Sequence, residues 1–393
     1  MVISLLWTGL TKERKMKNDP VTNIIKYEED IVFKLRSLYT AYGYRPYKMS
    51  KFEEYDLYVR NRDFLVSESV ITFNDTDGRL LALKPDVTLS IVKNSTDVDG
   101  FVNKVYYNEN VYRVSSRTET YREIMQTGLE CIGDIDTYNV IEVLSLAAKS
   151  LETISPDYVL DVSHMGIIFG LLEMTGANDV TKSAIIECIT SKNAHDLLRI
   201  CAENGIEQSI CDKLCKFISI YGDMDSVINK LKALDLGEWA DDIIDELQLI
   251  SDALGSDPIK SKLRLDFSIA NGMSYYNGIV FKGFINGIPD SVLSGGRYDR
   301  LLKKMSRTSG AIGFAVYLDV LEYMDTQSKA YDVDVLLLYN NNVSVNIVMD
   351  AVKNLTAQYS TVTAQKIVPQ KLKYRSVAQL SADGNIIFKE GNI

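Results

Sequence analysis

The chain has 393 residues, and its 43 lysines and arginines against 53 aspartates and glutamates give a formal net charge of −10. Hydrophobic residues make up 46% and charged residues 24%, which excludes a disordered or collagen-like chain. The acidic balance excludes a broadly basic nucleic-acid-binding surface, because counterion release needs clustered lysines and arginines facing phosphates. Protein or small-molecule partners fit this charge better, and the length predicts about two or three domains.

Cysteines and histidines form no pattern typical of a disulfide framework or a metal site. The five cysteines are an odd number without a secretion signal, so we expect reduced thiols in a cytoplasmic protein. Cys211 and Cys215 lie one helical turn apart, but the two histidines, His164 and His195, complete no Cys/His quartet. The apolar run Val2–Leu10 is too short to cross a bilayer. We therefore expect no metal, no cofactor and no membrane span.

The first part of the chain predicts an antiparallel core. An N-terminal extension, residues 1–22, precedes a helix over Asn23–Tyr42, where apolar residues recur every three or four positions. A further helix is expected over Tyr138–Leu151. Between the helices lie strand-like stretches: Ser69–Phe73, Leu80–Leu83 after an Asp77-Gly78 turn, Lys104–Tyr107, Val111–Arg113 and Gly128–Ile132. This pattern predicts an α+β fold, an antiparallel sheet flanked by helices, over residues 23–326.

The second part predicts a helical insertion and a small C-terminal unit. Helical patterns follow one another over Met165–Leu254, so we expect an insertion of about residues 165–258. Strand-like sequence then returns at Leu263–Phe267, Gly278–Phe284 and Ser291–Leu293. After a linker at Gln327–Ala330, residues 331–393 predict a small α/β unit of the βαβ type. Its elements are the strand Asp334–Tyr339, the helix Val345–Tyr359 and the strand Thr361–Val368.

Polar residues in the first half suggest a ligand pocket. Asp86 and Thr88 follow a strand-ending proline and could hold one ammonium group, or Asp86 could simply cap the next helix. Gln126 and Glu130 share one face of a strand, because side chains alternate with period two. An amide and a carboxylate there suit a ligand with a positive charge and ring nitrogens. A solvated sheet face is the alternative.

Three motifs in the second half are weaker. Tyr275 and Tyr276 lie between glycines and offer an aromatic wall, or core packing beside a turn. Ser294–Arg297 is interpreted as a glycine turn that delivers Arg297 to an anion, or as a plain surface turn. Ala311–Asp319 predicts a glycine-started core strand running into a helix. His164 and His195 lack a nucleophile at a suitable spacing, so we expect structural roles for both.

The order of these motifs resembles the catalytic core of class II histidyl-tRNA synthetases over Ile24–Asp325. The motifs are Leu83–Thr88, the hairpin Tyr112–Glu130, Gly272–Phe281, Gly295–Asp299 and Gly313–Leu318. The resemblance implies a homodimer and a histidine pocket. Its candidate residues are Asp86, Thr88, Gln126, Glu130, Tyr275 and Tyr276. Arg113 matches the arginine that grips the α-phosphate of ATP, and Arg297 is a second candidate for a residual nucleotide or anion site.

At two positions of the nucleotide site, the sequence differs from the synthetases. Asn271 stands where the synthetases have the arginine of an Arg-Gly-Leu-Asp-Tyr-Tyr run, and Tyr317–Val320 stands where they have Gly-Leu-Glu-Arg. Losing such electrostatic groups costs about 10² to 10³ in rate each. This profile is similar to the regulatory subunits of ATP phosphoribosyltransferase. It implies a non-catalytic, histidine-sensing subunit of the first step of histidine biosynthesis, a short-form catalytic partner, a hetero-octamer and feedback inhibition by histidine.

Two alternatives stay open. One is a divergent histidyl-tRNA synthetase, although the C-terminal unit resembles only a truncated anticodon-binding domain. The other is a synthetase-like module that senses tRNA, for which the support is a basic stripe: Lys366, Lys371, Lys373 and Arg375. We expect that stripe to be a solvated face instead of a tRNA site.

Overall fold

The computed structural model describes residues 27–65, 70–114, 120–270, 275–323 and 331–389. Its contacts divide the chain into two compact units, residues 31–324 and residues 325–393 together with 1–30. Among the described residues, no helix is both long and apolar enough to cross a membrane.

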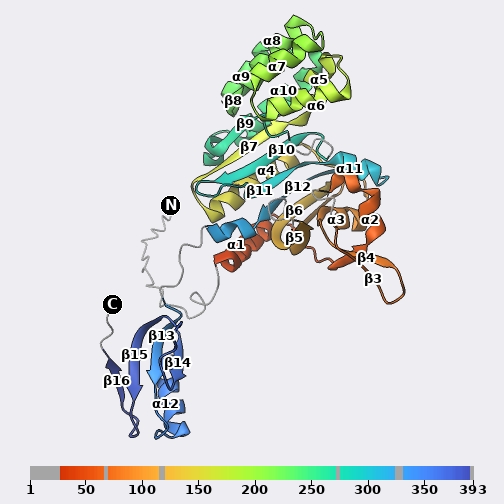
Figure 1. Ribbon diagram of the computed structural model, residues 1–393. Helices are drawn as coiled ribbons and strands as arrows, with labels where there is room; N and C mark the ends of the chain where they lie inside the picture. The colour runs from red at the N-terminus through yellow and green to blue at the C-terminus, as the bar shows by residue number, and fades with distance from the viewer. Residues whose placement is uncertain (1–26, 66–69, 115–119, 271–274, 324–330, 390–393) are drawn as a thin grey trace, which may run out of the picture. The chain divides into compact units, whose positions relative to one another are not determined.

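A nine-stranded sheet forms the centre of residues 31–324 (Figure 1). Across the sheet the strands are β1 (Arg45–Pro46), β5 (Val102–Val114), β6 (Tyr121–Gly133), β12 (Gly310–Tyr317), β11 (Leu293–Arg297), β10 (Ile279–Ile285), β7 (Tyr158–His164), β9 (Leu263–Asp266) and β8 (Tyr221–Asp223). Neighbours are antiparallel from β5 through β7. The expected antiparallel sheet flanked by helices is therefore confirmed.

One prediction within this sheet is confirmed and one was wrong. The strand-like stretches Lys104–Tyr107 and Val111–Arg113 both lie in β5, which pairs antiparallel with β6 as the predicted hairpin requires. Ser294–Arg297 is no turn but most of β11. Its glycines serve close approach instead of chain reversal, since a Cβ atom at Gly296 would lie 2.7 Å from the Ile279 carbonyl oxygen and the Tyr276 ring.

Two helices close one face of the sheet. α1 (Tyr27–Ala41) buries Ile31, Leu35 and Tyr39, the apolar stripe seen in the sequence. The Tyr39 ring packs edge-on against Phe314 of β12, and its hydroxyl hydrogen-bonds with Ser150 of α4 (Thr137–Ile154) at 3.0 Å. Asp136 begins α4 with a capping box. Phe314 points away from its neighbours Gly313 and Ala315, so the opposite face of the sheet is left for other elements.

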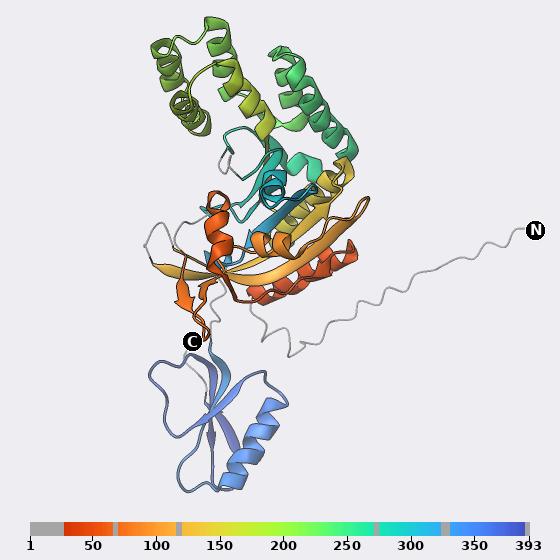
Figure 2. The same cartoon turned by 90° about the vertical axis from the view of Figure 1, so that its right-hand side faces the viewer.

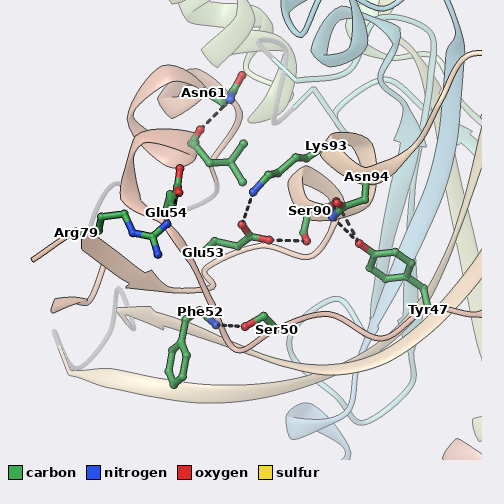
Figure 3. Close-up of polar contacts among 11 residues, drawn as sticks. Tyr47, Ser50, Phe52, Glu53, Glu54, Asn61, Arg79, Ser90, Lys93 and Asn94 are labelled. Atoms are coloured by element: carbon green, nitrogen blue, oxygen red, sulfur yellow. Dashed lines mark hydrogen bonds and ion pairs between the residues drawn. The ribbon is translucent and has the colours of Figure 1, made fainter. Parts of the chain in front are cut away.

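A small three-stranded sheet and several short helices pack against the opposite face of the central sheet. The sheet has the order β2 (Phe52–Glu54), β4 (Leu80–Leu83) and β3 (Thr72–Asn74), and the predicted Asp77-Gly78 hairpin joins β3 to β4. The helices are α2 (Tyr55–Arg60), η1 (Arg62–Phe64), α3 (Thr88–Asn94) and α11 (Asp299–Lys304). Figure 3 shows Glu53 of β2 accepting from Ser90 at 3.1 Å and from Lys93 at 2.7 Å. These contacts fasten β2 to α3.

The helices that follow β7 lie together at the top of Figure 2, and α9 among them packs against β8 and β9. They are α5 (Met165–Met174), α6 (Asp179–Thr190), α7 (Ala194–Glu203), α8 (Gln208–Ile218), α9 (Met224–Ala233) and α10 (Asp241–Leu254), followed by the short η3 (Pro258–Lys262). His164 caps α5, where its Nδ1 accepts from the Gly166 amide at 3.1 Å. All five cysteines are free thiols.

The C-terminal unit contains a four-stranded sheet of order β14 (Val362–Gln365), β13 (Val333–Leu338), β15 (Tyr374–Leu380) and β16 (Ile386–Lys389). β13, α12 (Val345–Thr356) and the parallel β14 form the predicted βαβ element. β15 and β16 were not predicted. The buried side chains Val335, Leu337 and Leu355 belong to a separate apolar core.

Candidate functional site

The register of the central sheet brings its polar residues to one face. In β6, Gln126 lies opposite Tyr317 of β12, and Glu130 lies opposite Gly313. Directly opposed residues of an antiparallel pair point to the same face, so both β6 side chains share it. A cavity of about 440 Å³ lies on this face. All candidate histidine-site residues line it: Asp86, Thr88, Gln126, Glu130, Tyr275 and Tyr276.

Glu130 is the buried carboxyl group of the cavity. It accepts hydrogen bonds from the Thr88 hydroxyl at 2.8 Å and from the Tyr298 hydroxyl at 2.5 Å. Burial raises its pKa to about 8. A Cβ atom at Gly313 would overlap the Glu130 carboxyl group, so only glycine leaves room for it there. At neutral pH the side chain is largely protonated and already has a partner for each oxygen.

Asp86 caps a helix, as one of its two interpretations predicted, and it also lines the cavity. One carboxylate oxygen accepts from the Leu89 amide at 2.8 Å and so caps α3, although Asp86 also lines the cavity. Its other oxygen lies 3.8 Å from the Arg113 guanidinium. Burial raises the Asp86 pKa, and the Arg113 charge opposes that rise. Arg113 is itself held by the Pro85 carbonyl oxygen, to which its Nε donates at 2.7 Å.

Gln126 is a buried polar side chain of the cavity that lacks a partner among the described residues. Only 2% of Gln126 is exposed, and its Nε2 has no hydrogen bond in the part of the chain that the structure describes. A buried donor without an acceptor costs about 1–3 kcal/mol. Because this donor belongs to a cavity-lining residue, a ligand acceptor is the natural group to remove that cost.

Aromatic rings form one wall of the cavity. The rings of Tyr275 and Tyr276 lie 4.7 Å apart, and Tyr275 lies 5.5 Å from Tyr298. Burial raises the pKa of each of these tyrosines, so all three stay neutral hydrogen-bonding groups. Tyr276 packs over Gly296, which explains why this position of the strand is a glycine.

One candidate lies elsewhere, and several lining residues were missed. Arg297 does not line the cavity, and its Nε donates to the Asp299 carboxylate at 2.8 Å. Among the missed residues are Tyr107, Lys282, Ser294 and Tyr298. Lys282 and Ser294 are brought to the cavity by the pairing of β12 with the distant strand β6, and sequence periodicity does not reveal that pairing. Asn271 and residues 115–119 lie outside the described residues.

The mostly antiparallel sheet, the long β5–β6 hairpin and the cavity above β6 and β12 define the fold of a class II aminoacyl-tRNA synthetase. Residues 20–321 match the family model described as histidyl-tRNA synthetase. Since this match covers more than half of the sequence, the chain belongs to the histidyl-tRNA synthetase family.

Individual relatives carry a narrower name. An ATP phosphoribosyltransferase regulatory subunit of Oceanobacillus iheyensis is 28% identical over 80% of this chain and 78% of its own length. A solved ATP phosphoribosyltransferase regulatory subunit/histidyl-tRNA synthetase from Bacillus halodurans C matches with TM-score 0.73 at 22% identity, covering 90% of this chain and 93% of that one. A chain of an ATP phosphoribosyl transferase complex from Thermotoga maritima matches with TM-score 0.59 at 19% identity, covering 75% and 98%. At these identities the two solved structures establish the fold alone.

Proposed function

We propose that this chain is the non-catalytic regulatory subunit of an ATP phosphoribosyltransferase and that its cavity binds histidine. The observation that carries the ligand assignment is the unpartnered Gln126 amide in a cavity that also holds the carboxyl groups of Asp86 and Glu130. Histidine offers an ammonium group for a carboxylate and ring nitrogens for Glu130. The names of the relatives support the assignment to histidine biosynthesis.

The residues around the cavity argue against nucleotide chemistry. Arg113 is the one arginine that lines it among the described residues, and its Nε already donates to a backbone carbonyl. Tyr317 lines the cavity at the position of the first glycine in the synthetases' Gly-Leu-Glu-Arg run. The arginine of that run is replaced by Val320, which supplies no cation to a phosphate. A retained amino-acid pocket without these groups suits sensing better than adenylation.

The partner is a short-form catalytic phosphoribosyltransferase subunit, in a hetero-octamer built on homodimers of this chain. The similarity to a chain of the Thermotoga maritima complex supports such an assembly. Histidine acts as the effector when it binds one quaternary state better than another. Its differential affinity then shifts the population of the catalytic subunits.

The test is phosphoribosyl-ATP formation by a short-form catalytic subunit, measured without this chain, with it, and with added histidine. We expect activity that depends on this chain and falls when histidine is added. Gln126→Met should keep the activation and weaken the inhibition by histidine about tenfold, whereas Gln358→Met, an exposed control in the C-terminal unit, should change neither.

Two results would overturn the proposal. One is a mixture in which the two chains associate but activity responds neither to this chain nor to histidine. The other is histidine-dependent ATP–pyrophosphate exchange by this chain alone, which would indicate a divergent synthetase.

A further inference from the structure

A single row of residues crosses the cavity floor from β10 to β5. Lys282 of β10 lies opposite Ser294 of β11, which lies opposite Ala315 of β12. Ala315 lies opposite Gly128 of β6, and Gly128 opposite Tyr107 of β5. Directly opposed residues share a face, so the Lys282 side chain rises on the same side as Gln126 and Glu130. All members of the row except Gly128 line the cavity.

The spacing of this row leaves room for a small molecule. Lys282 and Gly128 are three strands apart, or roughly 14 Å between Cα atoms at about 4.8 Å per strand. An extended lysine side chain of five bonds reaches about 6 Å. The residues between them, Ser294 and Ala315, are small. The remaining gap is therefore open to a ligand that contacts the β6 side chains at one end and an ammonium group at the other.

Lys282 is a cation without a protein anion. It is half-buried, and in the described parts of the chain it forms no ion pair and no hydrogen bond. Burial lowers its pKa, with no charged neighbour to oppose the change. Asp161 lies opposite Lys282 on β7, but the charges that act on the Asp161 pKa are those of Asp266, Lys192 and Arg264. A desolvated, unpaired ammonium group is costly, and an anion on the ligand would offset that cost.

The other cation of the cavity is already engaged. The Arg113 Nε donates to the Pro85 carbonyl oxygen, and its guanidinium lies 3.8 Å from the Asp86 carboxylate. The ammonium group of a ligand fits the Asp86 carboxylate, whereas a ligand carboxylate there would meet like charge. The free cation lies on β10, across the floor from β6.

We propose that Lys282 binds the carboxylate of the ligand and so makes the site selective for a free amino acid. This assignment rests on the proposed histidine site and names a residue that decides its specificity. Analogues in which the carboxylate is reduced or removed keep the ring and the ammonium group but lose this contact. The cavity should therefore discriminate histidine from histidinol and histamine through one side chain.

The test is calorimetric titration of the full chain with L-histidine and with L-histidinol. We expect Lys282→Met to weaken histidine binding about 10- to 100-fold, as for loss of a charged hydrogen bond, and to leave histidinol binding within about twofold. Lys282→Arg should restore part of the histidine affinity. Lys230→Met, at an exposed lysine of α9, serves as the control and should change neither affinity.

The outcomes separate this assignment from the function on which it rests. If the wild-type chain binds histidine and Lys282→Met binds it equally well, the assignment fails and the histidine site stands. Equal losses for histidine and histidinol in a variant with unchanged thermal unfolding would make Lys282 a structural residue and overturn the assignment too. A wild-type chain that binds neither ligand overturns the proposed site and this assignment together.

Discussion

Two sets of polar side chains line the same cavity and differ in how they are satisfied. In the first set, Glu130 is bonded by Thr88 and Tyr298, and Asp86 by the start of α3. In the second set, the amide of Gln126 and the ammonium group of Lys282 have no partner among the described residues. The first set makes its hydrogen bonds within the chain, so it stabilises the fold as well as lining the cavity. The second set carries an unrelieved cost that a ligand can remove.

The largest effect is expected from a substitution at Gly313, which lies opposite Glu130 of the first set. Gly313→Ala should lower the free energy of unfolding by about 3 kcal/mol or more, because the new methyl group would overlap both the Leu129 carbonyl oxygen and the Glu130 carboxyl group. Urea denaturation measures this loss. The control is Gly310→Ala on the same strand, where the nearest atoms are side-chain atoms at 3.2–3.3 Å. Equal losses in the two variants would contradict the close packing at Gly313.

Removing one donor from the satisfied set should cost less. Tyr298→Phe deletes the hydroxyl that donates to Glu130 at 2.5 Å and leaves a buried oxygen without that partner. We expect a loss of about 2 kcal/mol in the free energy of unfolding. The Glu130 pKa should also rise further, since this hydrogen bond now lowers it. A variant as stable as the wild type in urea denaturation would show that the bond contributes nothing net.

The satisfied set also predicts a pH dependence of stability. The Glu130 pKa is about 8 in the folded chain and 4.5 in the reference state. Between these values the folded chain holds a proton that the unfolded chain lacks. The contribution of Glu130 therefore falls as the pH rises through this window, by about 1.4 kcal/mol per pH unit. The stability difference between the wild type and Glu130→Gln, measured by urea denaturation from about pH 5 to about pH 8, should decline with pH; a constant difference would contradict it.

The smallest effect has the opposite sign and comes from the unpartnered set. Gln126→Met replaces a buried amide without a partner by an apolar side chain of similar length. We expect the empty protein to gain about 1 kcal/mol of stability while histidine binding weakens. Thermal unfolding with and without histidine measures both changes. A loss of stability in the empty variant would mean that Gln126 is a structural residue, and the contrast between the two sets would disappear.

Local periodicity predicted one part of the cavity and could not predict the rest. Gln126 and Glu130 lie four residues apart on one strand, so alternation alone places them on one face. Lys282 and Ser294 reach the same cavity because β12, the neighbour of β11, pairs with β6, which lies far away in the sequence. Such register is set by the packing of the whole sheet, so no local pattern contains it.

The wrong turn prediction has a physical cause. The glycines of Ser294–Arg297 suggested a turn because glycine tolerates turn conformations, but here they make room for Tyr276 and for the carbonyl oxygen of Gly313. A partner elsewhere in the fold outweighed the local preference. The polar middle of β5 stays within the strand, where Glu109 pairs with the buried Lys84.

The double use of Asp86 has a consequence for how the protein could report its own occupancy. The carboxylate group that lines the cavity also accepts from the Leu89 amide in the first turn of α3. Farther along α3, Ser90 and Lys93 donate to Glu53 of the small sheet, as drawn in Figure 3. A ligand ammonium group that binds Asp86 competes with the Leu89 amide for the same carboxylate group. The rate of amide hydrogen exchange at Leu89 should therefore change when a ligand binds in the cavity.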